Sequence, residues 1–164
     1  MSSFSRRTLL AQVLVAPLAL AACGFSPVYA PGGAGDALRG QVLVQEPTTP
    51  AGYLLTRQLE TRLGRSSNPR YALDMTLSTD EEGLAVNSSG DITRFNVLGE
   101  AGYALRDLDT GAVLTSGTVQ NFTAYSATGT TVATLAAQRD AIERLMTILA
   151  DQITARLFTL DLAA

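Results

Sequence analysis

The chain has 164 residues, and its 12 basic residues are all Arg, set against 15 Asp and Glu, with no His, no Trp and one Cys. The absence of His excludes an imidazole base and His metal ligands, and a single Cys excludes an internal disulfide or a CxxC pair. The formal charge of −3 gives no general attraction to nucleic acid, which is bound through basic residues. The length favours one domain.

Residues 1–22 are predicted to be a signal peptide. Arg6 and Arg7 precede the uncharged stretch 8–22, in which twelve of the 15 residues are Leu, Ala or Val. This stretch is shorter than the roughly 20 apolar residues of a membrane span and is typical of a secretory signal. It ends in the sequence Leu-Ala-Ala-Cys, which resembles the lipobox of bacterial lipoproteins.

That resemblance implies cleavage before Cys23 and attachment of fatty acyl chains, palmitate among them, to this residue. Two or more acyl chains are sufficient for stable membrane anchoring. Gly24 resembles the class of lipoproteins sorted to the outer membrane. The mature chain would have 142 residues and a charge of −5. Residues 5–10 also resemble a twin-arginine export signal, so either export route fits, and a free Cys after an ordinary signal peptide is the alternative.

Residues 23–40 are predicted to be a tether between the lipid and the domain. Seven of the 17 residues from Gly24 to Gly40 are Gly or Pro, which disfavours regular structure. Phe25, Val28 and Tyr29 are apolar side chains that a solvent-exposed spacer does not need. We therefore expect part of this segment to pack on the domain or on a partner.

A short strand at residues 41–45 and a helix from Pro50 to about Gly64 are expected next. Thr49 followed by Pro50 is a typical helix start, and Gly64 is a typical end. The helix carries its apolar stripe on Leu55, Leu59 and Leu63.

Alternating apolar and polar residues then predict three strands, near residues 71–78, 95–105 and 112–125. The turn-forming run 79–83 is expected to break the first strand or to form a bulge in it, and residues 84–86 to resume pairing. Turns at 88–91 and 109–111 make these strands an antiparallel meander.

The last element is predicted to be a helix from about residue 131 to 158, with a single apolar stripe. The order of elements is thus β-α-β-β-β-α. We expect an α+β two-layer sandwich over residues 41–160, with an antiparallel-rich four-stranded sheet and two helices on one face. The other sheet face is polar, so it is free to meet solvent or a large partner.

Candidate catalytic residues are few. Asp80, Glu81 and Glu82 lie in an expected turn, and Asp107 and Asp109 lack the ordered oxygen ligands of a calcium loop. Ser and Gly residues near 88–90 have no GxSxG context and no His partner. The sequence therefore predicts no enzyme, no cofactor and no metal site.

Several segments together resemble the LPS-assembly lipoprotein family, LptE. They are Cys-Gly-Phe-Ser-Pro-Val-Tyr at 23–29, Ile-Thr-Arg-Phe-Asn-Val at 92–97, Phe-Thr-Ala-Tyr-Ser-Ala-Thr-Gly at 122–129, and parts of the last helix at 139–145 and 151–153. The resemblance covers nearly all of residues 23–158 and rests on the order and spacing of these segments.

The resemblance implies a non-enzymatic outer-membrane lipoprotein, lipid-anchored on the periplasmic face. Proteins of this kind plug the lumen of the LptD β-barrel, help it to assemble and contact lipopolysaccharide on its way to the surface. Candidate lipopolysaccharide-binding residues are Arg94, Arg70 and Arg106, because Arg binds phosphates well. The loops in which better-known relatives carry basic residues have no cation here, at 87–90 and 130–134.

Two other classes stay open. A generic periplasmic lipoprotein that binds a small amphiphile or another envelope protein would be favoured by an apolar cavity between the helices and the sheet. A lipid-anchored enzyme using Asp and Ser would need a cleft with converging carboxylates of raised pKa.

Overall fold

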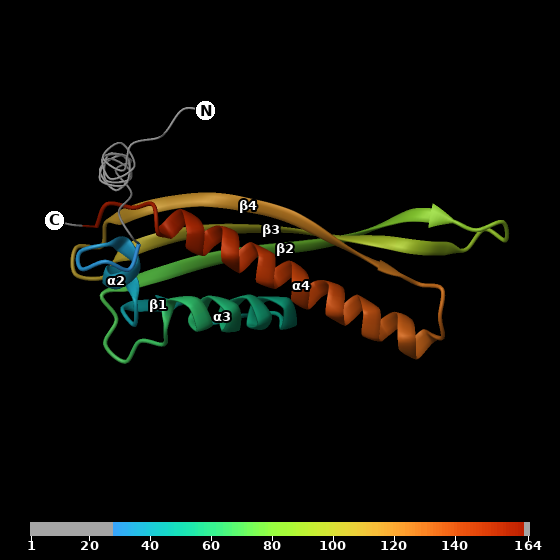
Figure 1. Cartoon of the computed structure of the whole chain (residues 1–164), viewed down its shortest axis with the longest axis horizontal. Coiled ribbons are helices and arrows are strands. Elements are labelled where there is room, and N and C mark those ends of the chain that lie inside the picture. The colour runs from blue at the N-terminus through green and yellow to red at the C-terminus, as the bar shows by residue number, and fades with distance from the viewer. Residues whose placement is uncertain (1–27, 163–164) are drawn as a thin grey trace, which may run out of the picture.

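The computed structural model describes residues 28–162, which form one four-stranded sheet with helices on one face (Figure 1). The predicted α+β class and the order β-α-β-β-β-α are confirmed. The predicted signal peptide (1–22), the lipidated Cys23 and the first part of the tether lie outside the described residues. The elements are α2 (Ala34–Leu38), β1 (Val42–Val44), α3 (Pro50–Leu63), β2 (Tyr71–Val86), β3 (Ile92–Asp107), β4 (Val113–Ser126) and α4 (Thr131–Leu157).

The sheet has the strand order β1-β2-β3-β4 and is mixed. β1 pairs with β2 in parallel, with Val42 opposite Tyr71. The β2–β3 and β3–β4 pairs are antiparallel, as the meander prediction required. α3 connects the two parallel strands, and it packs against α4 on the same side of the sheet.

Of the two outcomes expected for residues 79–83, the break is wrong, because β2 continues through this run, whereas a bulge-like irregularity follows directly between Gly83 and Ala85. Its residues pair with β3 without interruption from Tyr71 to Gly83, and the register shifts only after Gly83. Asp80 and Glu82 are exposed, whereas Glu81 receives hydrogen bonds from side chains of β4 and α4. Three consecutive acidic residues fit in a strand here, because alternation separates their side chains and none is buried without a partner.

The first long helix follows its sequence signals. The Thr49 hydroxyl oxygen accepts a hydrogen bond from the backbone N–H of Gly52 at 3.0 Å, and the helix ends at Gly64, whose φ is +80°. Leu55, Leu59 and Leu63 are buried, as their spacing predicted.

The second long helix spans 27 residues, about 40 Å, and is capped by Thr130. It packs on β3 and β4 through the buried residues Leu145, Leu149 and Ile153. It passes close to β3 at Gly99, where an added Cβ would lie 2.9 Å from the Leu145 side chain. Within residues 28–162, no helix has both the length and the apolar content needed to cross a membrane.

The two helices cover the sheet unequally. Figure 1 shows α3 under only the part of the sheet nearer to α2, while the β2–β3 hairpin projects beyond the first turn of α4 at the other end. We call the part of the sheet that α3 covers, nearer to α2, the proximal half. The remaining part, which ends in the β2–β3 hairpin, is the distal half. The core side chains that are fully buried, such as Leu38, Leu59 and Leu73, are concentrated in the proximal half.

Candidate functional site

The sheet face opposite the helices is not covered by any other element of the described chain. Every second residue of β2, β3 and β4 points to this face. Most of these side chains are small or polar, such as Asp74, Thr76 and Thr118. Two shallow hollows of about 380 and 600 Å³ lie on it. The smaller is lined by Asp80, Leu98, Glu100 and Phe122, and Phe122 is 59% exposed. This open face is therefore polar, with one exposed aromatic side chain.

The free edge of β4 is partly covered by side chains. Arg156 of α4 donates a hydrogen bond to the carbonyl of Thr118 at 2.7 Å, and Arg144 donates to the carbonyl of Ala124 at 3.1 Å. These contacts satisfy backbone acceptors that another strand would otherwise use. The edge is thus less open to strand pairing than its length suggests.

The three Arg residues predicted for lipopolysaccharide do not gather at one place. Arg106 donates to Asp74 at 3.1 Å, and Arg70 lies 3.6 Å from Asp107 and over the ring of Tyr71. Arg94 is twelve residues from Arg106 along β3, which corresponds to about 40 Å. It is exposed and has no carboxylate partner among residues 28–162.

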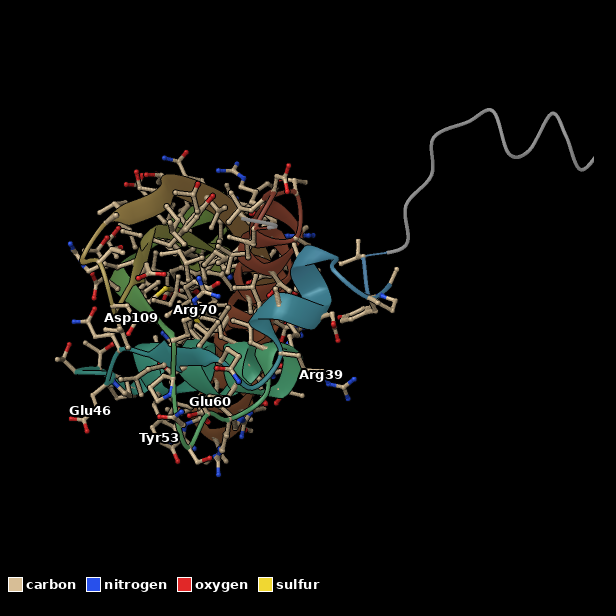
Figure 2. The ribbon with its side chains drawn as sticks, turned by 90° about the vertical axis from the view of Figure 1, so that its left-hand side faces the viewer. Arg39, Glu46, Tyr53, Glu60, Arg70 and Asp109 are labelled. Carbon is tan, nitrogen blue, oxygen red and sulfur yellow. The ribbon has the colours of Figure 1, made fainter. Side chains whose placement is uncertain are left out.

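Asp107 organises the turn after β3. Its Oδ1 accepts hydrogen bonds from the backbone N–H groups of Asp109 and Thr110 and from the Thr110 hydroxyl, all at 2.9 to 3.0 Å. The backbone N–H of Thr110 is the main cause that holds the pKa of Asp107 below its usual value, and Arg70 acts in the same direction. Figure 2 looks onto this end of the molecule. The carboxylate thus holds the turn that follows β3.

Glu81 ties the distal parts of three elements together. Its carboxylate accepts hydrogen bonds from the Tyr125 hydroxyl of β4 and, at 2.7 Å, from Gln138 of α4. The rings of Tyr125 and Phe95 stack at 5.3 Å. Burial raises the pKa of Tyr125 to about 12, and the hydrogen bond to Glu81 adds to the shift. Sequence reasoning missed this network, because partners 44 and 57 residues apart leave no local signal.

The segment from Val28 packs on the end of α4. The Tyr29 ring meets the Phe158 ring edge to face at 5.5 Å, and the Val28 carbonyl accepts a hydrogen bond from Gly35 at 3.0 Å. The helix α2 follows, with Leu38 fully buried. Part of the predicted tether, residues 23–40, was expected to pack on the domain or on a partner, and from Val28 the described chain lies on the domain, where Tyr29 and Leu38 supply apolar contacts.

The distal hairpin exposes apolar side chains. Leu84, Val86 and Ile92 are 53%, 64% and 43% exposed, and they lie beyond the region that the helices cover. Val132 in the first turn of α4 is 77% exposed. Exposed apolar side chains at one end of a domain are typical of contact surfaces.

No group of three Asp, Glu, Cys or His side chains in the part of the chain that the structure describes is arranged to hold a metal ion. The described carboxylates with several contacts, Asp107 and Glu81, are engaged by their own fold. What the geometry offers is therefore a set of surfaces for binding.

Comparison with known proteins supports the same view. No curated protein matches the sequence. Among solved structures, a lipoprotein from Caulobacter crescentus is 26% identical, with a TM-score of 0.63 over 77% of this chain and 93% of that chain. The rare lipoprotein B from Shewanella oneidensis is 12% identical, with a TM-score of 0.55 over 71% and 91% of the two chains.

A minor lipoprotein from Acinetobacter baumannii is 19% identical, with a TM-score of 0.51 over 71% of this chain and 87% of that chain. The likeness to the Shewanella and Acinetobacter proteins shows a shared fold. The model of the family described as LptE, lipopolysaccharide-assembly, matches residues 40–157. Because this match takes in most of the 164 residues, the chain belongs to the LptE family.

Proposed function

We propose that this chain is a lipid-anchored partner of an LptD-type outer-membrane β-barrel, which it plugs and helps to assemble, so that lipopolysaccharide is inserted at the cell surface. The family match over residues 40–157 carries the proposal. Membership of this family makes the chain an assembly lipoprotein and not an enzyme. The β-barrel partner and the plugging role are the parts of this proposal that go beyond family membership.

The open sheet face supports a barrel as the partner. Large barrels enclose polar, water-filled lumens. A face of Thr, Ser, Gln and paired charges, such as Asp74 with Arg106, suits contact with such a lumen better than contact with lipid tails. At 16 residues, β2 and β3 each reach about 50 Å, enough to extend through a membrane-spanning barrel.

The attachment of the N-terminal segment supports an orientation. If Cys23 carries the lipid, four residues separate it from Val28, and the two Cα atoms are at most about 18 Å apart. Because Tyr29 is packed on Phe158, this short connection would hold the proximal half near the inner leaflet of the outer membrane. The distal hairpin would then point away from the anchor.

Among the predicted lipopolysaccharide contacts, Arg94 is the strongest candidate. Arg70 and Arg106 already have carboxylate partners, so an added phosphate would compete with Asp107 and Asp74. Arg94 has no such competitor among the described residues and lies in the distal half. We expect Arg94→Glu to weaken contact with lipopolysaccharide, and Arg39→Glu to leave it unchanged.

Affinity purification of the tagged full-length chain from outer membranes tests the proposal. We expect a stoichiometric β-barrel protein to be recovered with it. Cys23→Ser should abolish labelling of the chain by radioactive palmitate and reduce its recovery from the membrane fraction. Recovery of no barrel from correctly lipidated chain would reject the partner, and labelling that persists in Cys23→Ser would reject the lipid acceptor.

A further inference from the structure

An apolar hollow of about 360 Å³ opens between α3, β2 and α4, on the helix side of the sheet. It lies where α3 begins, at the boundary between the proximal and distal halves. Its apolar walls come from Ala51 and Leu54 of α3, Leu77 of β2 and Ile142 of α4. This hollow is separate from the open face and from the distal hairpin, which the proposed function uses.

The four apolar side chains are only half-buried. Each packs against the hydrophobic core on one side and leaves its other side exposed toward the hollow. An apolar ligand bound here would therefore bury its own apolar surface and the exposed apolar surface of the four side chains. Burial of this kind favours the binding of a hydrocarbon chain.

The rim of the hollow favours a negative charge. Arg139 of α4 is exposed there, and no carboxylate of the described residues lies within ion-pair distance of it. Its neighbours on the same helix differ, because Arg144 pairs with Asp140 and Glu143 pairs with Arg57.

The start of α3 lies at the same rim and adds a second element favourable to anions. Thr49 and Pro50 line the hollow, and the N-terminal end of a helix carries a partial positive charge. None of the described residues that line the hollow is acidic, although the chain as a whole has a surplus of acids. Charge and shape therefore select an amphiphile with an anionic head.

The size of the hollow limits the apolar part of the ligand. Ligand pockets measure about 300 to 1,000 Å³, so this one is near the lower end of the range. It has room for one hydrocarbon chain and not for a bundle of several. We propose that the hollow binds one acyl chain of an anionic phospholipid, with the phosphate against Arg139 and the start of α3. This site goes beyond the proposed function and does not depend on the barrel.

Photolabelling of the full-length chain in outer-membrane vesicles tests this site. The probes are lysophosphatidylglycerol and lysophosphatidylcholine, which share one chain with a photoactivatable group near its end. After illumination, mass spectrometry maps the labelled peptides. We expect adducts on the peptides that contain Ala51, Leu54 and Leu77, and more of them with the anionic probe than with the zwitterionic one.

Arg139→Gln removes the charge without touching the apolar walls, and Arg39→Gln is the matched control, since Arg39 is an exposed Arg near α2 that points away from the domain (Figure 2). We expect Arg139→Gln to lower labelling by the anionic probe about threefold to tenfold, and to lower labelling by the zwitterionic probe less, because its choline group offsets the charge of its phosphate. Arg39→Gln should change neither.

Ala51→Phe tests the shape of the hollow, because the larger side chain fills it from the α3 wall. It should abolish labelling by both probes while recovery of the barrel is unchanged. The proposal is overturned if labelling spreads evenly over the surface, if it is equal for both probes and insensitive to Arg139→Gln, or if residues of a partner protein or of a second copy are found cross-linked in the hollow instead.

Discussion

The proximal and distal halves of this domain use the same sheet in different ways. In the proximal half, α3 and α4 bury the helix side of the sheet, and Leu59, Leu73 and Leu157 are fully buried. In the distal half, only α4 accompanies the strands, and Leu84 and Val86 are more than half exposed. The buried core and the exposed apolar side chains are thus separated along one sheet: the proximal half stabilises the fold, and the distal half offers a contact surface.

The substitution with the largest expected effect on stability removes a core side chain of the proximal half. Leu59→Ala deletes fully buried methyl groups between α3 and the sheet, so it should lower the free energy of unfolding by about 2 to 5 kcal/mol. The distal Leu84→Ala should change it by less than about 0.5 kcal/mol. Urea unfolding followed by circular dichroism measures both, and similar losses from the two variants would contradict the division into halves.

Gly99 tests a point where α4 packs closely on the sheet. An added side chain would meet Leu145 and Leu149, which are themselves fully buried and have little room to move. Gly99→Val should therefore lower the free energy of unfolding by about 1 to 3 kcal/mol. Gly90→Ala, at a turn with open space around it, serves as the glycine control, although its φ of +90° gives it a smaller cost of its own. An unchanged stability of Gly99→Val would show that α4 is free to shift.

Thr154 offers a change in the opposite direction. Its hydroxyl is buried in the proximal core and has no hydrogen-bond partner in the structure. Thr154→Val keeps the shape and removes the unpaired polar group, so we expect a gain in the free energy of unfolding of up to about 1 kcal/mol. A clear loss in thermal unfolding experiments would mean that the hydroxyl is satisfied in solution.

The network around Glu81 gives the distal half a dependence on alkaline pH. The pKa of Tyr125 is about 12 in the folded chain, above the ordinary value of 10, so the phenol stays protonated in the folded state where it ionises in the unfolded one. Its contribution is therefore complete below pH 10 and is lost as pH rises from 10 to 12. Relative to wild type, Tyr125→Phe should flatten the fall in stability over this window, measured by unfolding at several pH values. An identical slope in the two proteins would contradict this role.

The sequence alone predicts β1 and α3 of the proximal half well, whereas α2 was not predicted. The Thr49 cap, the Gly64 end and the spacing of Leu55, Leu59 and Leu63 act within a few residues, and each is found as expected. The continuous course of β2 through Asp80 and Glu82 was not predicted, because pairing with β3 overrides the turn propensity of that run. The apolar hollow between α3, β2 and α4 could not be predicted from the sequence either, since only the fold brings its side chains together.

The proposed function requires contact between the open face and a β-barrel, and photo-crosslinking measures this contact most directly. A photoactivatable amino acid is placed in the full-length chain at Thr118 or Gln120 on the open face, or at Asn68 in the proximal loop before β2, and the cells are illuminated. We expect a strong adduct to an outer-membrane β-barrel protein from the open face and a weak one from Asn68. Barrel adducts that are absent from the open face, or equally strong at Asn68, would contradict it.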